Sequence, residues 1–433
     1  MNISLFEFIN YFVLLYPIYM SLVWMIGGLI FYVRREGGQQ KFPELEHYPL
    51  FSIVIPAHNE EDHIQRVISH LSTVNYPKYE VIVVNDGSTD KTEKILNDLV
   101  TRYPQYLRVV HLVSNMGKAT ALNTGILVSR GEFILTIDAD AFLHPDALRW
   151  IAWHFVKFPR VGAVTGNPRV ANRTTLLAKL QVCEYASIIG LIKRTQRLLG
   201  KVLTVSGVIA AFRKTALYDV GFFATDMVTE DIDVTWKLEK RFWDIRFESR
   251  ALCWVLVPET VRGLWRQRQR WAQGGVEVLK KHLNIWLDWR QRRLWPIYVE
   301  YLVSAAWAYN FLMLMILWGV IILIQGTIGK YMNITLTIPL NPAIPKWGGS
   351  ILALTCLIQF FVSAVIDHKY EKSVLKYYFW VIWYPFFYWS ISALAVVVAT
   401  PKALIKKPGT RAVWRSPDRG LKDMRKQKWY DNR

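Results

Sequence analysis

Two carboxylates separated by one residue, Asp138 and Asp140, follow the apolar run Phe133–Ile137 near the middle of the chain. A short apolar run is typical of a buried parallel strand, and open α/β sheets bind ligands beyond the carboxyl ends of their strands. Two neighbouring carboxylates repel each other unless a cation neutralises them. A hard divalent ion does so while it also binds the phosphates of a substrate. A surface turn, which Asp favours, explains the pair equally well at this point.

Two further acids follow predicted strands. Glu60 lies shortly after the apolar run 51–56, which ends in Pro56, and Asp86 follows the run 80–85. These strands alternate with predicted helices over about 61–72, 88–103 and 118–129, and a further strand is predicted over 107–112. The alternation predicts an α/β fold with a mostly parallel sheet, in which the strand ends share one edge. Acids after three strands at one edge indicate a site for a nucleotide and a metal ion rather than solvated turns.

A third acidic pair stands at the predicted start of a helix, in Thr229-Glu230-Asp231. Thr229 is a suitable N-cap residue, and acids interact favourably with the positive end of a helix dipole. Plain capping therefore explains Glu230 and Asp231 as well as a chemical role does. Before this point the sequence predicts a strand over 161–165 and a helix over 176–198.

The composition is that of a membrane protein with a basic cytoplasmic side. The chain has 433 residues, 52% of them hydrophobic, and a net charge of +19. Residues 11–33 carry no charge and are followed by Arg34 and Arg35, which predicts a retained span whose C-terminal end is cytoplasmic. The three cysteines have no metal-binding or redox spacing.

A basic and aromatic stretch, 262–296, contains nine Arg or Lys and five Trp residues, including the run Gln267-Arg268-Gln269-Arg270-Trp271. Such interleaving suits single-stranded nucleic acid, and it equally suits an amphipathic helix on anionic lipid. The stretch directly precedes an apolar segment, which favours the membrane surface over nucleic acid.

Three more apolar segments, 301–324, 347–366 and 377–400, are each long enough to span a membrane. The tail 401–433 is strongly basic, which predicts a cytoplasmic position. Three full spans after a cytoplasmic domain would instead place the tail outside. Pro385 makes the last segment the candidate for a broken, re-entrant or interfacial helix.

The predicted organisation therefore has six parts: a first span in 1–35, a linker in 36–50, a catalytic sheet domain in 51–260, an amphipathic interfacial region in 261–296, a membrane region in 297–400 and a basic tail in 401–433.

At the level of motifs the chain resembles the processive family-2 glycosyltransferases, which include cellulose, chitin and hyaluronan synthases. The order and spacing of four motifs carry the resemblance: Asp86, Asp138-Ala139-Asp140, Thr229-Glu230-Asp231 and Gln267-Arg268-Gln269-Arg270-Trp271. The stretches 166–169, 184–197, 205–213 and 414–420 look closest to the bacterial poly-β-1,6-N-acetylglucosamine synthases. The resemblance covers nearly the whole chain and departs from some relatives at the amino end, where they carry an extra span.

The resemblance implies a cytoplasmic GT-A domain that uses UDP-N-acetylglucosamine and a divalent metal, Mg²⁺ or Mn²⁺. By analogy with the family, Asp86 and Asp138 contact the nucleoside, Asp140 binds the metal, and Asp231 is the general base with Glu230 beside it. The remaining candidates are Pro56, Glu60 and Lys118 at the donor site, and Gln267, Arg270 and Trp271 at the acceptor and diphosphate site.

General chemistry agrees with these roles. Transfer with inversion needs a carboxylate that takes the proton of the acceptor hydroxyl and positive charge that stabilises departing UDP. The planar guanidinium of Arg270 suits phosphate, and Trp271 offers a flat face for a sugar ring. The simpler explanations are an ordinary core or interfacial tryptophan for Trp271 and a surface lysine at a helix start for Lys118.

The function that follows is a multi-pass enzyme of the bacterial inner membrane that polymerises N-acetylglucosamine and exports the chain. Two alternatives stay open: a related synthase that makes chitin or hyaluronan, and a catalytically silent subunit that senses nucleotide. The expected partners are the growing polysaccharide and the lipid bilayer. The resemblance adds a small membrane subunit and activation by cyclic di-GMP, which the tail or Arg290–Arg293 would face. Nucleic acid is not expected as a partner.

Overall fold

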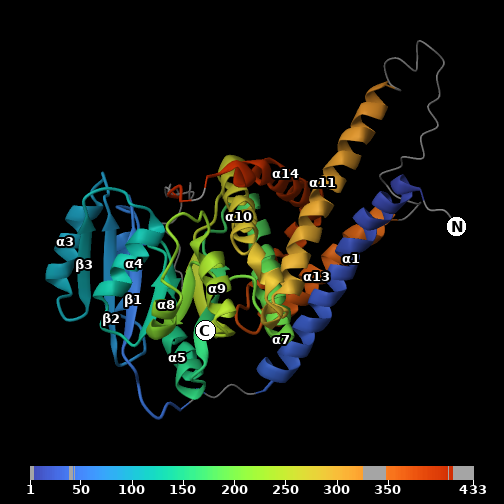
Figure 1. Ribbon diagram of the computed structural model, residues 1–433. Coiled ribbons are helices and arrows are strands. Elements are labelled where there is room, and N and C mark those ends of the chain that lie inside the picture. Colours follow the sequence, from blue (N-terminus) through green and yellow to red (C-terminus); the bar gives the residue numbers. More distant parts are fainter. Residues whose placement is uncertain (1–3, 39–41, 43, 325–347, 408, 413–433) are drawn as a thin grey trace.

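The computed structural model describes residues 4–38, 42, 44–324, 348–407 and 409–412. Its centre is one eight-stranded sheet with the strand order β3-β2-β1-β4-β7-β6-β8-β5. The strands are β1 (Phe51–Ala57), β2 (Tyr79–Asp86), β3 (Leu107–Leu112), β4 (Phe133–Ile137), β5 (Phe142–Leu143), β6 (Val161–Val170), β7 (Ile209–Arg213) and β8 (Asp244–Val255). The sheet and its helices form the left-hand part of Figure 1.

The first half of the sheet is parallel, as the sequence predicts. β1 pairs with β2 and β4, and β2 pairs with β3, all in parallel. β1 and β4 are buried along their whole length, which explains why they are continuous apolar runs. The pairing of β1 with β4 ends at Val54 and Thr136, so the strands separate before their carboxyl ends. Pro56, which lacks an N–H, lies beyond this last pair.

Helices cover both faces of the sheet domain. They are α2 (Ile64–Leu71), α3 (Thr92–Arg102), α4 (Lys118–Val128), α5 (Ala147–Lys157), α8 (Lys214–Asp219) and α9 (Glu230–Lys240). The sequence predicted α3 to begin near Ser88, but it begins at Thr92. The reason is that the Ser88 hydroxyl accepts the backbone N–H of Asn59 at 3.0 Å, so it joins the β1 and β2 loops instead of capping the helix.

The second half of the sheet mixes directions. β7 is antiparallel to β4 and β6, whereas β6 and β8 are parallel. The predicted helix over 176–198 is present, but as α6 (Leu176–Glu184), a π-helical segment (Tyr185–Leu191) and α7 (Ile192–Leu199). It packs beside the sheet and against α1 (Leu5–Phe31), where Thr195 donates to the carbonyl of Trp24.

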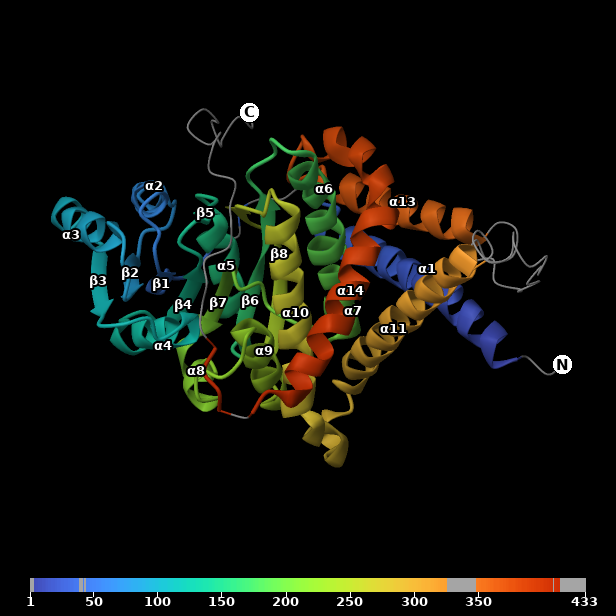
Figure 2. The same ribbon diagram turned by 90° about the horizontal axis from the view of Figure 1, so that it is seen from above.

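Four helices are long and apolar enough to cross a membrane within the described part of the chain: Leu5–Glu36, Trp295–Ile324, Ser350–Asp367 and Tyr388–Ile405. The helices α1, α11 (Trp295–Ile324) and α13 (Gly348–Asp367) run together away from the sheet domain (Figure 1). The fourth, α14 (Tyr384–Ile405), instead lies along α10 (Val261–Lys281), as Figure 2 shows.

The predicted segment 377–400 is not one helix. A 3₁₀ helix, Val374–Trp383, ends where α14 begins. Pro385 is the second residue of α14, and a proline in the first helical turn needs no hydrogen-bond partner for its missing N–H. Pro385 therefore marks the start of a helix rather than a break inside one.

The chain returns to the sheet domain after α14. The ammonium group of Lys406 lies 3.0 Å from Glu277 Oε2 on α10, and the backbone N–H of Ala412 donates to the carbonyl of Thr225 at 3.1 Å. Residues 406, 407 and 409–412 thus lie on the same side of the apolar helices as the sheet. The rest of the predicted basic tail falls outside the described residues. Residue 347, the first of the predicted apolar segment 347–366, also falls outside them.

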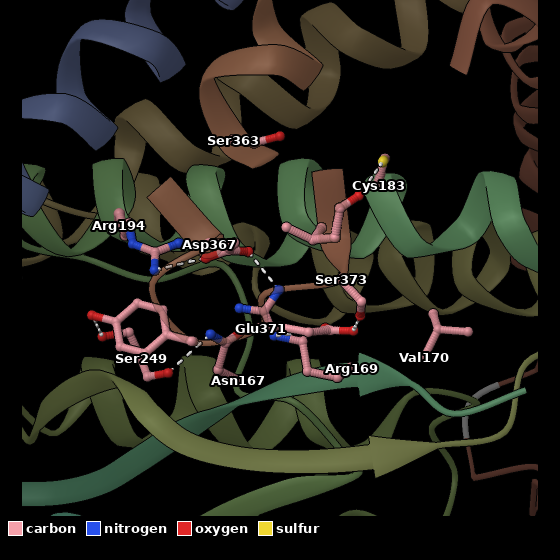
Figure 3. A network of polar contacts seen from close by, with 12 residues as sticks. Asn167, Arg169, Val170, Cys183, Arg194, Ser249, Ser363, Asp367, Glu371 and Ser373 are labelled. Carbon is pink, nitrogen blue, oxygen red and sulfur yellow. Dashed lines mark hydrogen bonds and ion pairs between the residues drawn. The ribbon is translucent and has the colours of Figure 1, made fainter. Parts of the chain in front are cut away.

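A buried ionic network joins the apolar helices to the sheet domain (Figure 3). Arg194 of α7 binds Glu36 at 2.9 Å and Asp367, the last residue of α13, at 2.9 Å. Asp367 also accepts a hydrogen bond from Arg169 of β6 at 2.6 Å. All four side chains are at most 2% exposed. Glu36, expected to open a polar linker, is thus part of this buried junction.

Candidate active site

The acids predicted to share one sheet edge follow the parallel strands β1, β2 and β4, whose carboxyl ends lie at the same edge. Asp86, at the end of β2, is fully buried and accepts the backbone N–H groups of Met116 and Gly117 at 2.7 and 2.8 Å. These residues precede α4, so Asp86 fixes the loop that places Lys118. Gly117 has a φ of 90°, which favours glycine at this turn.

Lys118 links two motifs that are far apart in the sequence. Its ammonium lies 2.7 Å from Asp138 Oδ1 and 3.4 Å from Glu230 Oε1. The neighbouring carboxylates raise the pKa of Lys118 even though its burial acts in the opposite direction. The lysine is therefore a firmly charged cation inside the site, and the alternative of an ordinary surface lysine is wrong.

Asp231 is placed as a base would be. Its Oδ2 accepts the N–H of Gly207 at 3.2 Å, and its Oδ1 accepts that of Ile232 at 3.0 Å. Burial and the adjacent Glu230 charge raise the pKa of Asp231 from 3.8 to about 6, against the opposing effects of Lys118 and Arg270. A carboxyl group with a pKa near the working pH is suited to general base catalysis.

Capping does not explain the start of α9. Thr229 occupies the N-cap position, but its hydroxyl makes no capping hydrogen bond and is buried without a partner among the described residues. Glu230 is buried and pairs with Lys118, whereas Asp231 bonds to the loop before β7. The two acids are thus used for contacts within the site.

Asp140 lies at the same strand end and is 5% exposed. Among the described residues no three His, Cys, Asp or Glu side chains come together as a complete metal site. Asp138 is already neutralised by Lys118, which leaves Asp140 as the carboxylate suited to a divalent ion that takes its other ligands from a diphosphate and water. The residues present therefore fit a substrate-bridging metal and not a closed protein cage.

The Gln-Arg-Gln-Arg-Trp run lies on α10, which packs against α14 and α9. Arg270 is exposed, and its charge acts on Asp231, so it lies at the mouth of the site. Gln267 has a buried Oε1 without a hydrogen-bond partner among the described residues. Trp271 is half-buried and stacks with the guanidinium of Arg268, 4.5 Å from the ring centroid.

Arg268, which was not among the predicted site residues, anchors the Gln-Arg-Gln-Arg-Trp run. It is 7% exposed and pairs with Glu184 of α6 at 2.7 Å. Its position on the buried side of an amphipathic helix was the available signal, because residues 264, 268 and 272 recur at helical spacing.

The remaining predicted residues lie on the nucleotide side of the edge. Pro56 is buried near the end of β1, two residues beyond its last pair with β4. Glu60 is 2% exposed, and its backbone N–H donates to the Thr92 hydroxyl at 2.8 Å. Lys193, which the sequence did not single out, is buried close to Asp231.

Comparison with known proteins is consistent with this geometry. Residues 49–274 match the family model described as "Glycosyltransferase like family 2". The chain is 39% identical over 413 residues to the poly-β-1,6-N-acetyl-D-glucosamine synthase of Staphylococcus epidermidis, covering 94% of this chain and 98% of the relative. It is 40% identical over 426 residues to the synthase of the same name from Staphylococcus aureus strain MSSA476, covering 96% and 99%.

Among solved structures, a mannosyltransferase from Pyrobaculum calidifontis, in complex with GDP-mannose and Mn²⁺, is similar over 91% of this chain and 99% of its own. The TM-score is 0.51 and the sequence identity 19%, so this likeness concerns the fold, a GT-A arrangement. The family model spans more than half of the chain, and the two synthases match it almost from end to end. The chain belongs to the family-2 glycosyltransferases.

Proposed function

We propose that this protein is a membrane-embedded inverting glycosyltransferase that polymerises N-acetylglucosamine from UDP-N-acetylglucosamine into a β-1,6-linked chain. The observation that carries the proposal is the position of Asp231, half-buried beside the buried Glu230 and under the influence of the cations Lys118 and Arg270. The nearly full-length similarity to two synthases of this polymer supports the choice of sugar and linkage.

The chemistry follows from the charges at the site. Asp231 takes the proton of the acceptor hydroxyl as its oxygen attacks C1 of the donor sugar, and the bond from C1 to the diphosphate oxygen breaks with its electron pair on UDP. Attack from the side opposite the diphosphate inverts the α-linked donor to a β-linked product. Arg270 and Lys118 supply positive charge near the departing group.

A divalent metal, Mg²⁺ or Mn²⁺, would be held by Asp140 and would neutralise the diphosphate charge as it grows. Asp138 keeps its bond to Lys118 and orients the donor, and Asp86 shapes the adjoining loop through Met116 and Gly117. The donor side therefore combines a fixed lysine with Asp140, the carboxylate that would hold the ion.

We place the sheet domain on the cytoplasmic face of the bacterial inner membrane. In this arrangement α1, α11 and α13 cross the bilayer, whereas α14 lies along α10 on the cytoplasmic side (Figure 2). Residues 406–412 bind the sheet domain, which supports an even number of crossings after it. The product would leave through the helices directly beside the site, because a polar chain cannot cross hydrocarbon unshielded.

Regulatory partners belong to the same proposal. Four cations, Arg160, Lys201, Arg290 and Arg293, line a cavity of ≈ 240 Å³ together with the acids Glu239 and Asp244, so that its basic residues outnumber its acids. Such a site suits a phosphodiester, either an anionic lipid headgroup or cyclic di-GMP delivered with a small membrane subunit. Full activity of this chain alone, unchanged by the dinucleotide, would reject the dinucleotide and the subunit.

The test is synthesis by purified protein in sealed vesicles with the donor supplied on the cytoplasmic face. We expect UDP release, a polymer with 1,6 linkages by linkage analysis, and protection of the product in the lumen from an added glycosidase. A 1,4-linked product, or a need for a second sugar nucleotide, would point to chitin or hyaluronan synthesis. Product fully accessible outside would mean that export needs another protein. No UDP release from an intact preparation would favour the silent sensor.

Asp231→Asn isolates the base. We expect donor binding to persist and turnover to fall by about 10²- to 10⁴-fold, the usual contribution of a general base. A loss of only a few-fold would assign the base to Glu230.

A further inference from the structure

Lys193 is a buried cation whose place in the fold none of the four motifs accounts for. It is the second residue of α7 and is 5% exposed. Its ammonium donates to the Thr165 hydroxyl at 3.2 Å. Within the described residues no carboxylate lies within ion-pair distance of it, although a buried lysine is normally paired.

The charged group that acts on Lys193 is Asp231. Burial lowers the pKa of Lys193 to about 7, and the Asp231 carboxylate opposes that effect. The interaction is mutual, so the ammonium also favours the ionised form of Asp231. The other charges that act on Asp231 come from Glu230 on the same helix, Lys118 on α4 and Arg270 on α10.

A continuous set of contacts links the lysine to the base. Thr165, on β6, receives the Lys193 bond and also accepts the backbone N–H of Ser206 at 2.8 Å. The next residue, Gly207, donates its N–H to Asp231 at 3.2 Å. A Cβ built on Gly207 would lie 2.9 Å from Asp231 Oδ2, so the loop presses its backbone directly on the base.

The elements on either side of Lys193 point to a functional position that packing alone does not explain. The π-helical segment 185–191 directly precedes α7, and such segments are frequent at functional sites. α7 is held against α1 through Thr195 and Trp24, so it is fixed by the membrane helices. Lys193 thus extends from this fixed helix to Thr165 on β6.

We propose that Lys193 is a positioning residue for the transfer reaction: through Thr165 and the 206–207 backbone it holds Asp231 in the orientation that accepts the proton of the acceptor hydroxyl. This role rests on the proposed function of Asp231 as the base. It adds a member to the site that lies outside all four motifs and comes from the helix bound to α1.

The experiment compares four variants in vesicles at several pH values. Lys193→Met and Thr165→Val should lower kcat by about 10- to 100-fold, the cost of misplacing a reacting group by an ångström or less. The KM for UDP-N-acetylglucosamine should change little, because the donor contacts lie elsewhere. Thr165→Ser keeps the hydroxyl and should retain most of kcat. Lys193→Met should also move the acidic limb of the kcat/KM profile to higher pH, because a positive charge near the carboxylate is lost.

The matched control is Lys237→Met. Lys237 lies on α9 with Asp231, but its ammonium donates to the carbonyl of Phe222 on the far side of the helix start. We expect kcat and the acidic limb to stay unchanged. If the acidic limb shifts in Lys237→Met as much as it does in Lys193→Met, the specific link between Lys193 and Asp231 is wrong.

Asp231→Asn, measured in parallel, separates the two proposals. If it is inactive while Lys193→Met and Thr165→Val keep wild-type kcat and pH profile, the role of Lys193 is wrong and that of Asp231 stands. If Asp231→Asn keeps near wild-type turnover, the base assignment fails and the role of Lys193 fails with it. Thr165→Val keeps the test decisive even where Lys193→Met does not fold.

Discussion

Thr229 and Gly274 touch at the point where α10 meets the start of α9, which carries Glu230 and Asp231. A Cβ built on Gly274 of α10 would lie 2.1 Å from the Thr229 hydroxyl, closer than any real contact. Thr229 directly precedes Glu230 and Asp231, and Gly274 lies one helical turn beyond Arg270. The missing side chain at residue 274 is therefore what lets α10 bring Arg270 up to the base.

Gly274→Ala should separate α10 from the start of α9. Because Arg270 would move away from Asp231, we expect kcat to fall by about 10²-fold, as for an ångström-scale misplacement. Turnover per molecule of membrane-inserted protein measures this. The control is Gly319→Ala on α11, where a Cβ would meet nothing within 4 Å. Equal activity of the two variants would show that the close approach is unimportant.

The pH profile should report the carboxyl group of Asp231. Its pKa is raised to about 6, and only the ionised form accepts a proton. We therefore expect kcat/KM to be constant above about pH 7 and to fall tenfold per pH unit below about 6. Glu230→Gln removes a negative charge that raises this pKa, so the acidic limb should move to lower pH. The control is Glu93→Gln, exposed on α3, which should leave the acidic limb in place. An acidic limb that does not move in Glu230→Gln would show that the limb does not report the pKa of Asp231.

Asp140→Asn should abolish transfer while the protein stays folded and inserted. The reason is that a neutral amide neither attracts a divalent ion nor balances its charge. Titration of Mg²⁺ and Mn²⁺ against UDP release measures the effect, with Asp98→Asn on the exposed face of α3 as the control. Near wild-type turnover of Asp140→Asn without added metal would contradict the assignment.

Asp367→Asn should weaken the junction between α13 and the sheet domain. It leaves the buried guanidinium groups of Arg169 and Arg194 without this carboxylate, a change that typically costs about 3–5 kcal/mol. Thermal unfolding followed by size exclusion in detergent should show a lower midpoint. Asp288→Asn removes an exposed ion pair with Arg290 and keeps an amide oxygen that can still accept the Arg290 backbone N–H, so it should change the midpoint little. An unchanged midpoint in Asp367→Asn would show that the network carries no stability.

The local sequence pattern was sufficient to predict the parallel half of the sheet. The runs that form β1, β2 and β4 are apolar along their length because both faces are covered, and their acids follow directly. β5 and β8 were missed. β8 carries Arg246, Glu248 and Arg250, whose side chains meet partners distant in the sequence: Arg246 stacks on Phe158, Glu248 bonds to His154 and Arg250 stacks on Trp150. A strand with internal charges resembles a loop until those partners are known.

The sequence by itself determined the family, the acidic strand ends, the base candidate and the apolar helices, because residue type, spacing and hydropathy are local properties. Only the tertiary structure decided that Lys118 neutralises Asp138, that Arg268 rather than its neighbours anchors α10, and that Thr165 and the 206–207 backbone connect Lys193 to Asp231. It likewise decided that α14 lies along α10 and that residues 406–412 return to the sheet domain. The physical reason is that burial and electrostatic pairing join residues many positions apart, and a one-dimensional pattern does not contain those distances.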